Sequence, residues 1–180
     1  MEAGGVAGDL GEVALRVVQC RPDRGVEHMI GCHPDESCHN RGMEHDGFVV
    51  RPVGRVESAL TDRADAPRQG DEGAPEAWIV FEERVAPALA DLRPGDQVLL
   101  LTWLHRADRE VLAVHPRGDR SRPETGVFST RAPDRPNPIG LHRAGILAVD
   151  GLRVRVGGLE AIHGTPVLDV KPVLGAVDER

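Results

Sequence analysis

Apolar residues occur in short clusters along residues 48–172, and turn-forming residues separate these clusters at intervals of about ten residues. The clusters are rich in Val, Ile, Leu and Phe, which favour strands over helices at this length. Within this region only residues 86–92 carry a short helical signal, with Pro87 in the first turn. We therefore expect an all-β fold, an antiparallel barrel or sandwich with one short helix and long loops. The expected strands are 48–56, 77–81, 97–104, 110–115, 127–130, 143–149, 152–156 and 166–172.

Residues 1–42 differ in pattern, so we assign the main domain to residues 43–180. An apolar set with helical spacing across residues 10–17 predicts a short helix. The following segment holds all three cysteines but no Cys-x-x-Cys pair, so no metal is expected. The segment could be a flexible polar tail, or an upstream extension if Met43 is the start. A zinc site remains a third alternative, with ligands Cys20, Cys32, Cys38 and His39.

Composition excludes several classes of function. The net charge of -7 provides no global basic field for nucleic acid, and 3% aromatic residues leave few platforms for base stacking. The chain has no dinucleotide fingerprint, no phosphate-binding P-loop and no Gly-x-Ser-x-Gly elbow. It also has no apolar run of membrane-spanning length and no signal peptide, so we expect a cytoplasmic protein without a membrane partner.

One stretch, residues 126–141, stands out because it carries three prolines among polar residues. Each proline fixes φ and removes an amide donor, and it also restricts the residue before it. We therefore predict a stiff, kinked loop after a short strand. A group held on a stiff loop loses less entropy when a ligand binds, which favours a binding loop over a plain connector.

Polar residues collect at the ends of expected strands, where they could converge at one mouth of a barrel. Each has a simpler explanation: a turn for Gln69, a strand cap for His105 and solvated charge for the arginines. Asp169 and Lys171 point the same way on a strand and could form a surface ion pair of little energetic value. Spacing alone therefore predicts only a polar site, with Gln69, His105, Arg131, Asn137, Asp169 and Lys171 as candidates.

Four segments together resemble the TsaA/TrmO-like family. They are GVFSTRAPDRPNPIGL at 126–141, GTPVLDVKP at 164–172, PRQG at 67–70 and WLHRADR at 103–109. The resemblance covers residues 48–174. It implies a small antiparallel β-barrel that binds S-adenosylmethionine, usually as a homodimer with the cofactor near the subunit interface. It also implies N-methylation of threonylcarbamoyladenosine beside the anticodon of tRNA.

The resemblance also assigns residues by position. It places Asp169 and Lys171 near the reacting centre. We expect Arg120, Arg122 and Arg135 at the phosphates of the anticodon loop, since arginine pairs well with phosphate. The implied cofactor site consists of Gln69, His105, Thr130, Arg131, Asn137, Ile139 and Leu141.

Two positions depart from the family pattern. His163 stands where members commonly have aspartate, and Val173 stands where they commonly have tyrosine. His163 could act as a base because histidine titrates near neutrality, or it could simply occupy a turn. Two other functions therefore stay open: methylation of a small metabolite, and S-adenosylmethionine binding without catalysis.

Overall fold

The computed structural model describes residues 15–19 and 46–174, and the chain divides into two compact units at residues 51/52. In the first unit, β1 (Leu15–Gln19) pairs antiparallel with β2 (Asp46–Val50). The helix predicted across residues 10–17 is therefore wrong for residues 15–17. β-Branched residues in β1 favour a strand, and β2 supplies its hydrogen-bonding partner. The cysteine-rich segment lies outside the described residues.

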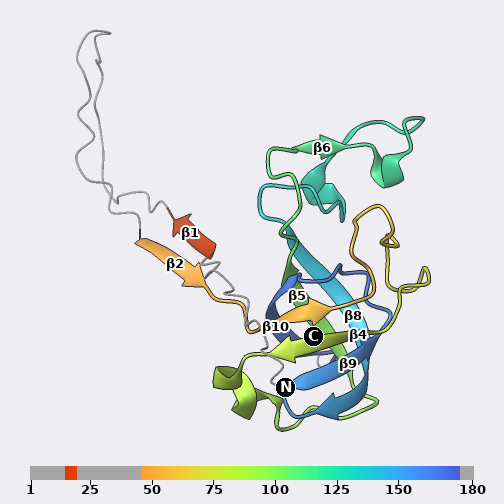
Figure 1. Ribbon diagram of the computed structural model, residues 1–180. Coiled ribbons are helices and arrows are strands. Elements are labelled where there is room, and N and C mark those ends of the chain that lie inside the picture. Colours follow the sequence, from red (N-terminus) through yellow and green to blue (C-terminus); the bar gives the residue numbers. More distant parts are fainter. Residues whose placement is uncertain (1–14, 20–45, 175–180) are drawn as a thin grey trace, which may run out of the picture. The chain divides into compact units, whose positions relative to one another are not determined.

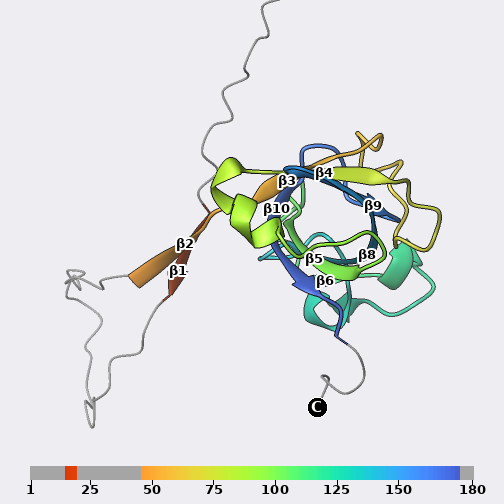
Figure 2. The same cartoon turned by 90° about the horizontal axis from the view of Figure 1, so that it is seen from below.

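The second unit contains a closed ring of six antiparallel strands, which Figure 2 shows from one end. This ring confirms the small antiparallel barrel. The strand order around it is β10-β3-β4-β9-β8-β5. The strands are β3 (Gly54–Glu57), β4 (Ala77–Phe81), β5 (Gln97–Trp103), β8 (Ile139–Asp150), β9 (Arg153–Gly157) and β10 (Pro166–Pro172).

The first strand of the ring differs from its prediction. A single strand over 48–56 is wrong, because β2 ends at Val50 and β3 begins at Gly54. Pro52 lies between them and lacks the amide donor that a continuous ladder needs.

Side chains that alternate along the strands point into the barrel and fill it. Every second residue of β4 and β9 is buried, and the residues between them are partly or fully exposed. The fully buried side chains are mostly branched and aliphatic, as a narrow barrel requires. The core includes Val56, Ile79, Phe81, Val98, Leu100, Ala144, Ile146, Val154, Val156, Leu159 and Val167.

The number of paired residues differs between neighbouring strands of the ring. Seven residue pairs join β5 to β8, whereas only two pairs join β3 to β10. The joint between β3 and β10, which we call the seam, connects the first and the last strand of the ring. A bulge also interrupts β10 between Val167 and Asp169.

Helices in the described residues are short and all of the 3-10 type. The predicted helix at 86–92 begins earlier and ends sooner, as η1 (Glu83–Leu89), with Pro87 inside it. Its hydrogen bonds run from residue i+3 to residue i, and none of them requires a donor from proline. Leu89 is buried in the core and anchors this helix.

The long excursion between β5 and β8 contains most of the errors in the predicted strands. The strand expected at 110–115 is reduced to β6 (Ala113–Val114), which pairs with β7 (Thr125–Gly126). The strand expected at 127–130 is wrong: η3 (Val127–Ser129) occupies it, because Val127 is buried while Phe128 is 82% exposed. A third helix is η2 (Pro116–Gly118).

This excursion and the loop between β3 and β4 extend from the same end of the barrel, whereas η1 lies at the opposite end (Figure 1). The barrel thus has one mouth surrounded by long loops. Among the described residues, no helix is long and apolar enough to cross a membrane.

Candidate active site

A cleft of about 1240 Å³ opens at the mouth surrounded by the long loops. This volume exceeds the range of roughly 300–1,000 Å³ that is usual for one small ligand. Its walls come from the β3–β4 loop, the end of β5, the region around β6 and η2, the proline-rich loop, the start of β8 and the segment after β9. Lining residues that carry polar groups include Arg68, Gln69, His105, Arg120, Thr130, Arg131, His142 and Glu160.

The proline-rich loop is stiffened from within by one side chain. The Arg135 guanidinium donates to the backbone carbonyl oxygens of Ala132 at 2.9 Å, Val127 at 2.7 Å and Thr130 at 2.5 Å. The Ala132 amide in turn donates to Thr130 Oγ1. Three of the five Arg135 donors are thus directed at its own loop, and Nη1 has no hydrogen-bond partner among residues 49–174, so binding of RNA phosphate by Arg135 stays a prediction.

Asp134 ties the proline-rich loop to two other loops of the mouth. Its carboxylate accepts two hydrogen bonds from Arg63, at 2.8 and 2.9 Å, and one from the Asp108 amide at 2.8 Å. Arg63 also donates to the carbonyl oxygen of Arg106. Three segments far apart in sequence are thereby held around the cleft.

Besides Arg135, seven of the residues predicted for cofactor or RNA line the cleft, although the Thr130 hydroxyl is already bonded within the proline-rich loop. They are Gln69, His105, Arg120, Thr130, Arg131, Ile139 and Leu141. Asn137 and Arg122 do not line it. Arg122 instead pairs with Asp119 at 3.3 Å on the exposed loop after η2.

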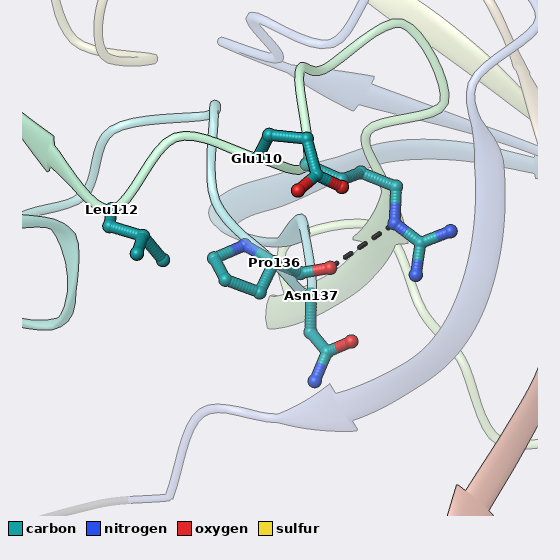
Figure 3. A pocket seen from close by; sticks show the side chains of 5 residues that line it. Glu110, Leu112, Pro136 and Asn137 are labelled. Carbon is teal, nitrogen blue, oxygen red and sulfur yellow. Dashed lines mark hydrogen bonds between the residues drawn. The ribbon is translucent and has the colours of Figure 1, made fainter.

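Asn137 lies at a smaller pocket of about 440 Å³, shown in Figure 3. The pocket is formed where Arg109 Nε donates to the Pro136 carbonyl oxygen at 3.2 Å. The Arg109 guanidinium also stacks over the Trp103 ring, 5.4 Å from its centre. The Asn137 side chain is exposed, whereas the proline that follows it is buried.

The three residues predicted to be catalytic lie away from the cleft. Asp169 and Lys171 are on the outer face of β10, where their side chains pair at 2.8 Å and are 48% and 60% exposed. Val170 between them packs against the core, so its neighbours must point outward. His163 is exposed in the turn before β10, and its amide donates to the Leu60 carbonyl oxygen. A single chain therefore does not bring these residues into the cleft.

The cleft carries arginines that are not already paired. Arg63 and Arg117 are bound to Asp134 and Glu72, respectively. Within residues 49–174, by contrast, no carboxylate lies within 4.0 Å of Arg68, Arg120 or Arg131. Their charge is available to an anionic ligand.

His105 lies among these arginines at the end of β5. Partial burial lowers the pKa of His105 below the usual 6.5, and the positive charge of Arg106 lowers it further. The ring is therefore predominantly neutral at pH 7.

A buried hydrogen-bonded array, missed in the sequence, lies below the mouth. Thr102 Oγ1 is 2.8 Å from His142 Nε2, and His142 Nδ1 is 2.8 Å from Glu160 Oε1. Thr102 is fully buried and His142 is 5% exposed. A Cβ on Gly140 would lie 2.4 Å from Thr102 Oγ1 and 2.6 Å from His142 Nε2. Only glycine at this position leaves room for the array.

One signal for this array was available in the sequence. The strand predicted to begin at Arg143 begins at Ile139, which is four residues earlier. Extending the two-residue alternation backward from Ala144 and Ile146 places His142 on the inner face. Glu160 lies in an irregular segment after β9, and no periodicity marks it.

Residues 55–179 match the family model described as the tRNA-methyltransferase O N-terminal domain. The chain belongs to the TrmO family. A crystal structure of TrmO from Pseudomonas aeruginosa is similar to the TrmO-family chain, with a TM-score of 0.57 and 30% sequence identity. The similarity covers 73% of this chain and 58% of that one, so the chain spans less than two thirds of the solved TrmO structure.

Two archaeal relatives of this TrmO-family chain are matched over most of their length. A probable S-adenosyl-L-methionine-binding protein of Methanothermobacter thermautotrophicus is 44% identical over 129 residues, covering 72% of this chain and 92% of the relative. An S-adenosyl-L-methionine-binding protein of Archaeoglobus fulgidus is 37% identical over 131 residues, covering 73% of this chain and 93% of the relative.

Proposed function

We infer that this TrmO-family chain is an S-adenosylmethionine-dependent methyltransferase that methylates N6 of threonylcarbamoyladenosine next to the tRNA anticodon. The observation that carries the proposal is the cleft of about 1240 Å³ beside the stiff proline-rich loop. This volume exceeds that of a pocket for one small ligand, which suits a cofactor and an acceptor nucleoside together.

The residues of the cleft fit S-adenosylmethionine. The apolar side chains of Leu104, Ile139 and Leu141 offer a surface for its uncharged parts, and Arg131 offers an unpaired charge for its carboxylate. Gln69 supplies a further hydrogen-bonding group. The bound cofactor supplies a methyl group already activated by a sulfonium, so the protein's task is to align the acceptor with it.

The RNA would meet the arginines that the protein leaves unpaired. Arg68 and Arg120 line the cleft within loops that reach beyond the barrel, where they suit phosphates on either side of an inserted nucleoside. The chain as a whole is acidic, with a net charge of -7, so this local cluster has to provide the attraction. Binding of tRNA is accordingly expected to weaken with salt.

A homodimer would allow Asp169 and Lys171, which lie on the outer face of β10, to take part in the reaction. Ile139 and Leu141 are 46% and 44% exposed on the outer face of β8, separated by β5 from Asp169 and Lys171 on β10. A second copy packed beside this part of β8 would place the cofactor that contacts Ile139 and Leu141 near the subunit interface, and would bring its own Asp169 and Lys171 toward the first cleft. This arrangement is part of the proposal.

Calorimetry with S-adenosylmethionine tests the cofactor. Arg131→Ala is expected to weaken binding by about tenfold or more, in line with the loss of one charge-assisted hydrogen bond. Arg55→Ala is the matched control, because Arg55 lies on the barrel wall and pairs with Glu57. Equal affinities for the two variants would show that the cofactor site has been misplaced.

Mass spectrometry of tRNA nucleosides tests the acceptor. Purified protein, S-adenosylmethionine and tRNA bearing threonylcarbamoyladenosine should together yield the N6-methylated nucleoside. If the cofactor binds but the tRNA is unchanged, the acceptor is a different molecule, such as a small metabolite, or the protein binds without catalysing transfer. If the cofactor does not bind, the whole proposal is wrong.

A further inference from the structure

Glu160 differs from the other carboxylates of the cleft. Asp134 is neutralised by Arg63, and Glu124 is exposed on the loop before β7. The Glu160 side chain is only 20% exposed, yet it lines the cleft. Within residues 49–174, no lysine or arginine lies within 4.0 Å of it. It is therefore the one mostly buried carboxylate without a lysine or arginine partner among the described residues that line the cleft.

The array below Glu160 holds the carboxylate in one orientation. An ionised carboxylate can only accept, so His142 Nδ1 must donate to Glu160 Oε1. In the neutral form of the ring, Nε2 then accepts from the Thr102 hydroxyl. The Thr102 hydroxyl and the His142 Nδ1–H therefore both donate in the direction of Glu160, and both residues are buried.

The second carboxylate oxygen is left for a ligand. Glu160 Oε2 is 3.4 Å from the position that a Cβ on Gly70 would occupy, so it lies beside the turn that carries Gln69. No hydrogen bond to Oε2 from any residue between 49 and 174 is present. Other candidate bases are worse placed: His163 and Asp169 do not line the cleft, and no hydrogen bond from a described residue fixes the His105 ring.

The movement of charge during methyl transfer decides where such a carboxylate is useful. Positive charge leaves the sulfur and develops on the acceptor nitrogen. A carboxylate against the sulfur would stabilise the state before the reaction more than the transition state, and would slow the transfer. A carboxylate at the nitrogen stabilises the transition state instead.

We propose that Glu160 is the catalytic residue that receives the proton of the methyl-acceptor nitrogen, and that His142 is its positioning residue. This inference rests on the proposed function. The nitrogen lone pair forms the bond to the methyl carbon, and the bond from that carbon to sulfur breaks with its electron pair going to sulfur. The N–H proton passes to Glu160 Oε2, and from the resulting carboxylic acid to solvent as the product leaves.

The test compares Glu160→Gln with Glu160→Asp at saturating S-adenosylmethionine and tRNA. Glutamine keeps an oxygen that accepts from His142 but takes no proton, so single-turnover methyl transfer should fall by about 10²–10⁴-fold. Aspartate keeps a carboxylate that can take the proton, but its side chain is one methylene shorter, so the rate should fall less than in Glu160→Gln. Glu76→Gln is the matched control, since Glu76 is exposed and pairs with Arg155 away from the cleft.

Cofactor affinity is the readout that does not depend on activity. Calorimetry should give Glu160→Gln the same Kd for S-adenosylmethionine as the unaltered protein, within about twofold, with an unchanged melting temperature. A loss of affinity as large as the loss of rate would show that Glu160 binds the sulfonium, and would overturn the proposal. Full activity of Glu160→Gln would overturn it as well.

His142→Gln tests positioning. Glutamine can still donate to Glu160 but cannot also contact Thr102, so kcat should fall while KM for tRNA stays unchanged. A rise in KM with unchanged kcat would contradict the positioning role. If the unaltered protein methylates no tRNA, the proposed function fails and Glu160 loses its role with it. If it is active while Glu160→Gln is equally active, only the role of Glu160 fails.

Discussion

Two sets of polar side chains in the same barrel have opposite surroundings. Thr102, His142 and Glu160 are joined inside the mouth, whereas Asp169 and Lys171 are paired on the outer wall. Each set contains a hydrogen bond or an ion pair of 2.8 Å, so distance does not separate them. The two sets differ in burial, because water screens the outer pair and is excluded from most of the inner array. Disturbing the inner set should therefore have much larger effects.

The largest effect is expected from Gly140→Ala. The new methyl group would lie within 2.6 Å of both Thr102 Oγ1 and His142 Nε2. Overpacking and the lost buried hydrogen bond together should lower the free energy of unfolding by roughly 2–5 kcal/mol in urea denaturation. Gly145→Ala on the same strand is the control, because its methyl group would meet only the movable end of Gln97. Equal losses in the two variants would contradict the need for space at Gly140.

Thr102→Val should have the next largest effect. Valine fills the same volume but leaves His142 Nε2 buried without a partner. The expected loss is about 1–3 kcal/mol in the free energy of unfolding. Thr61→Val on an exposed loop controls for the change of side chain. A neutral result at Thr102 would mean that water reaches His142.

A double-mutant cycle with Asp169→Asn and Lys171→Met should give a smaller value. In a single chain, where this ion pair is exposed, its coupling energy is expected to be about 0.2–1 kcal/mol. A coupling of several kcal/mol would instead show that the pair is buried, as it would be if a second copy packed against the outer wall.

The smallest effect concerns His105. Its pKa is lowered in the folded protein, so the unfolded chain binds more protons between that value and 6.5. Stability should therefore rise with pH through this window and fall as the solution is acidified. A His105→Asn variant should lose slightly less stability than the unaltered protein between pH 7 and 5. An NMR titration of His105 with a midpoint above 6.5 would contradict this sign.

The strands that the sequence predicts well are those where burial and turn chemistry agree. Residues 77–81 and 166–172 form strands with the expected bounds, and Gly151, at a φ of 55°, closes the expected hairpin before β9. Prediction failed between residues 110 and 130, where the excursion packs against the mouth rather than within the ring. There the burial of Val127 and the exposure of Phe128 are decided by tertiary contacts that local propensity does not contain.

The residues predicted for the site that line the cleft come from segments with a recognisable motif, whereas the array that the fold assembles from separate segments was missed. The proline-rich loop supplied Thr130 and Arg131 directly. Thr102, His142 and Glu160 come from three separate segments, which the pairing of β5 with β8 and of β8 with β9 brings together. Arg135 shows a further limit, because the sequence does not reveal that three of its donors bind the carbonyl oxygens of its own loop.

The seam between β3 and β10 has a consequence for how the barrel opens. Two residue pairs hold it, and the neighbouring amides of Val53 and Val56 add bonds to Val167 and Thr165. Local opening is expected first where the fewest residues pair, so backbone amide protons in the seam should exchange with deuterium before those between β5 and β8. Because Thr165 also lines the cleft, a ligand bound there would close this joint and slow the exchange. Hydrogen exchange at the seam would thus report occupancy of the cleft without any measurement of methyl transfer.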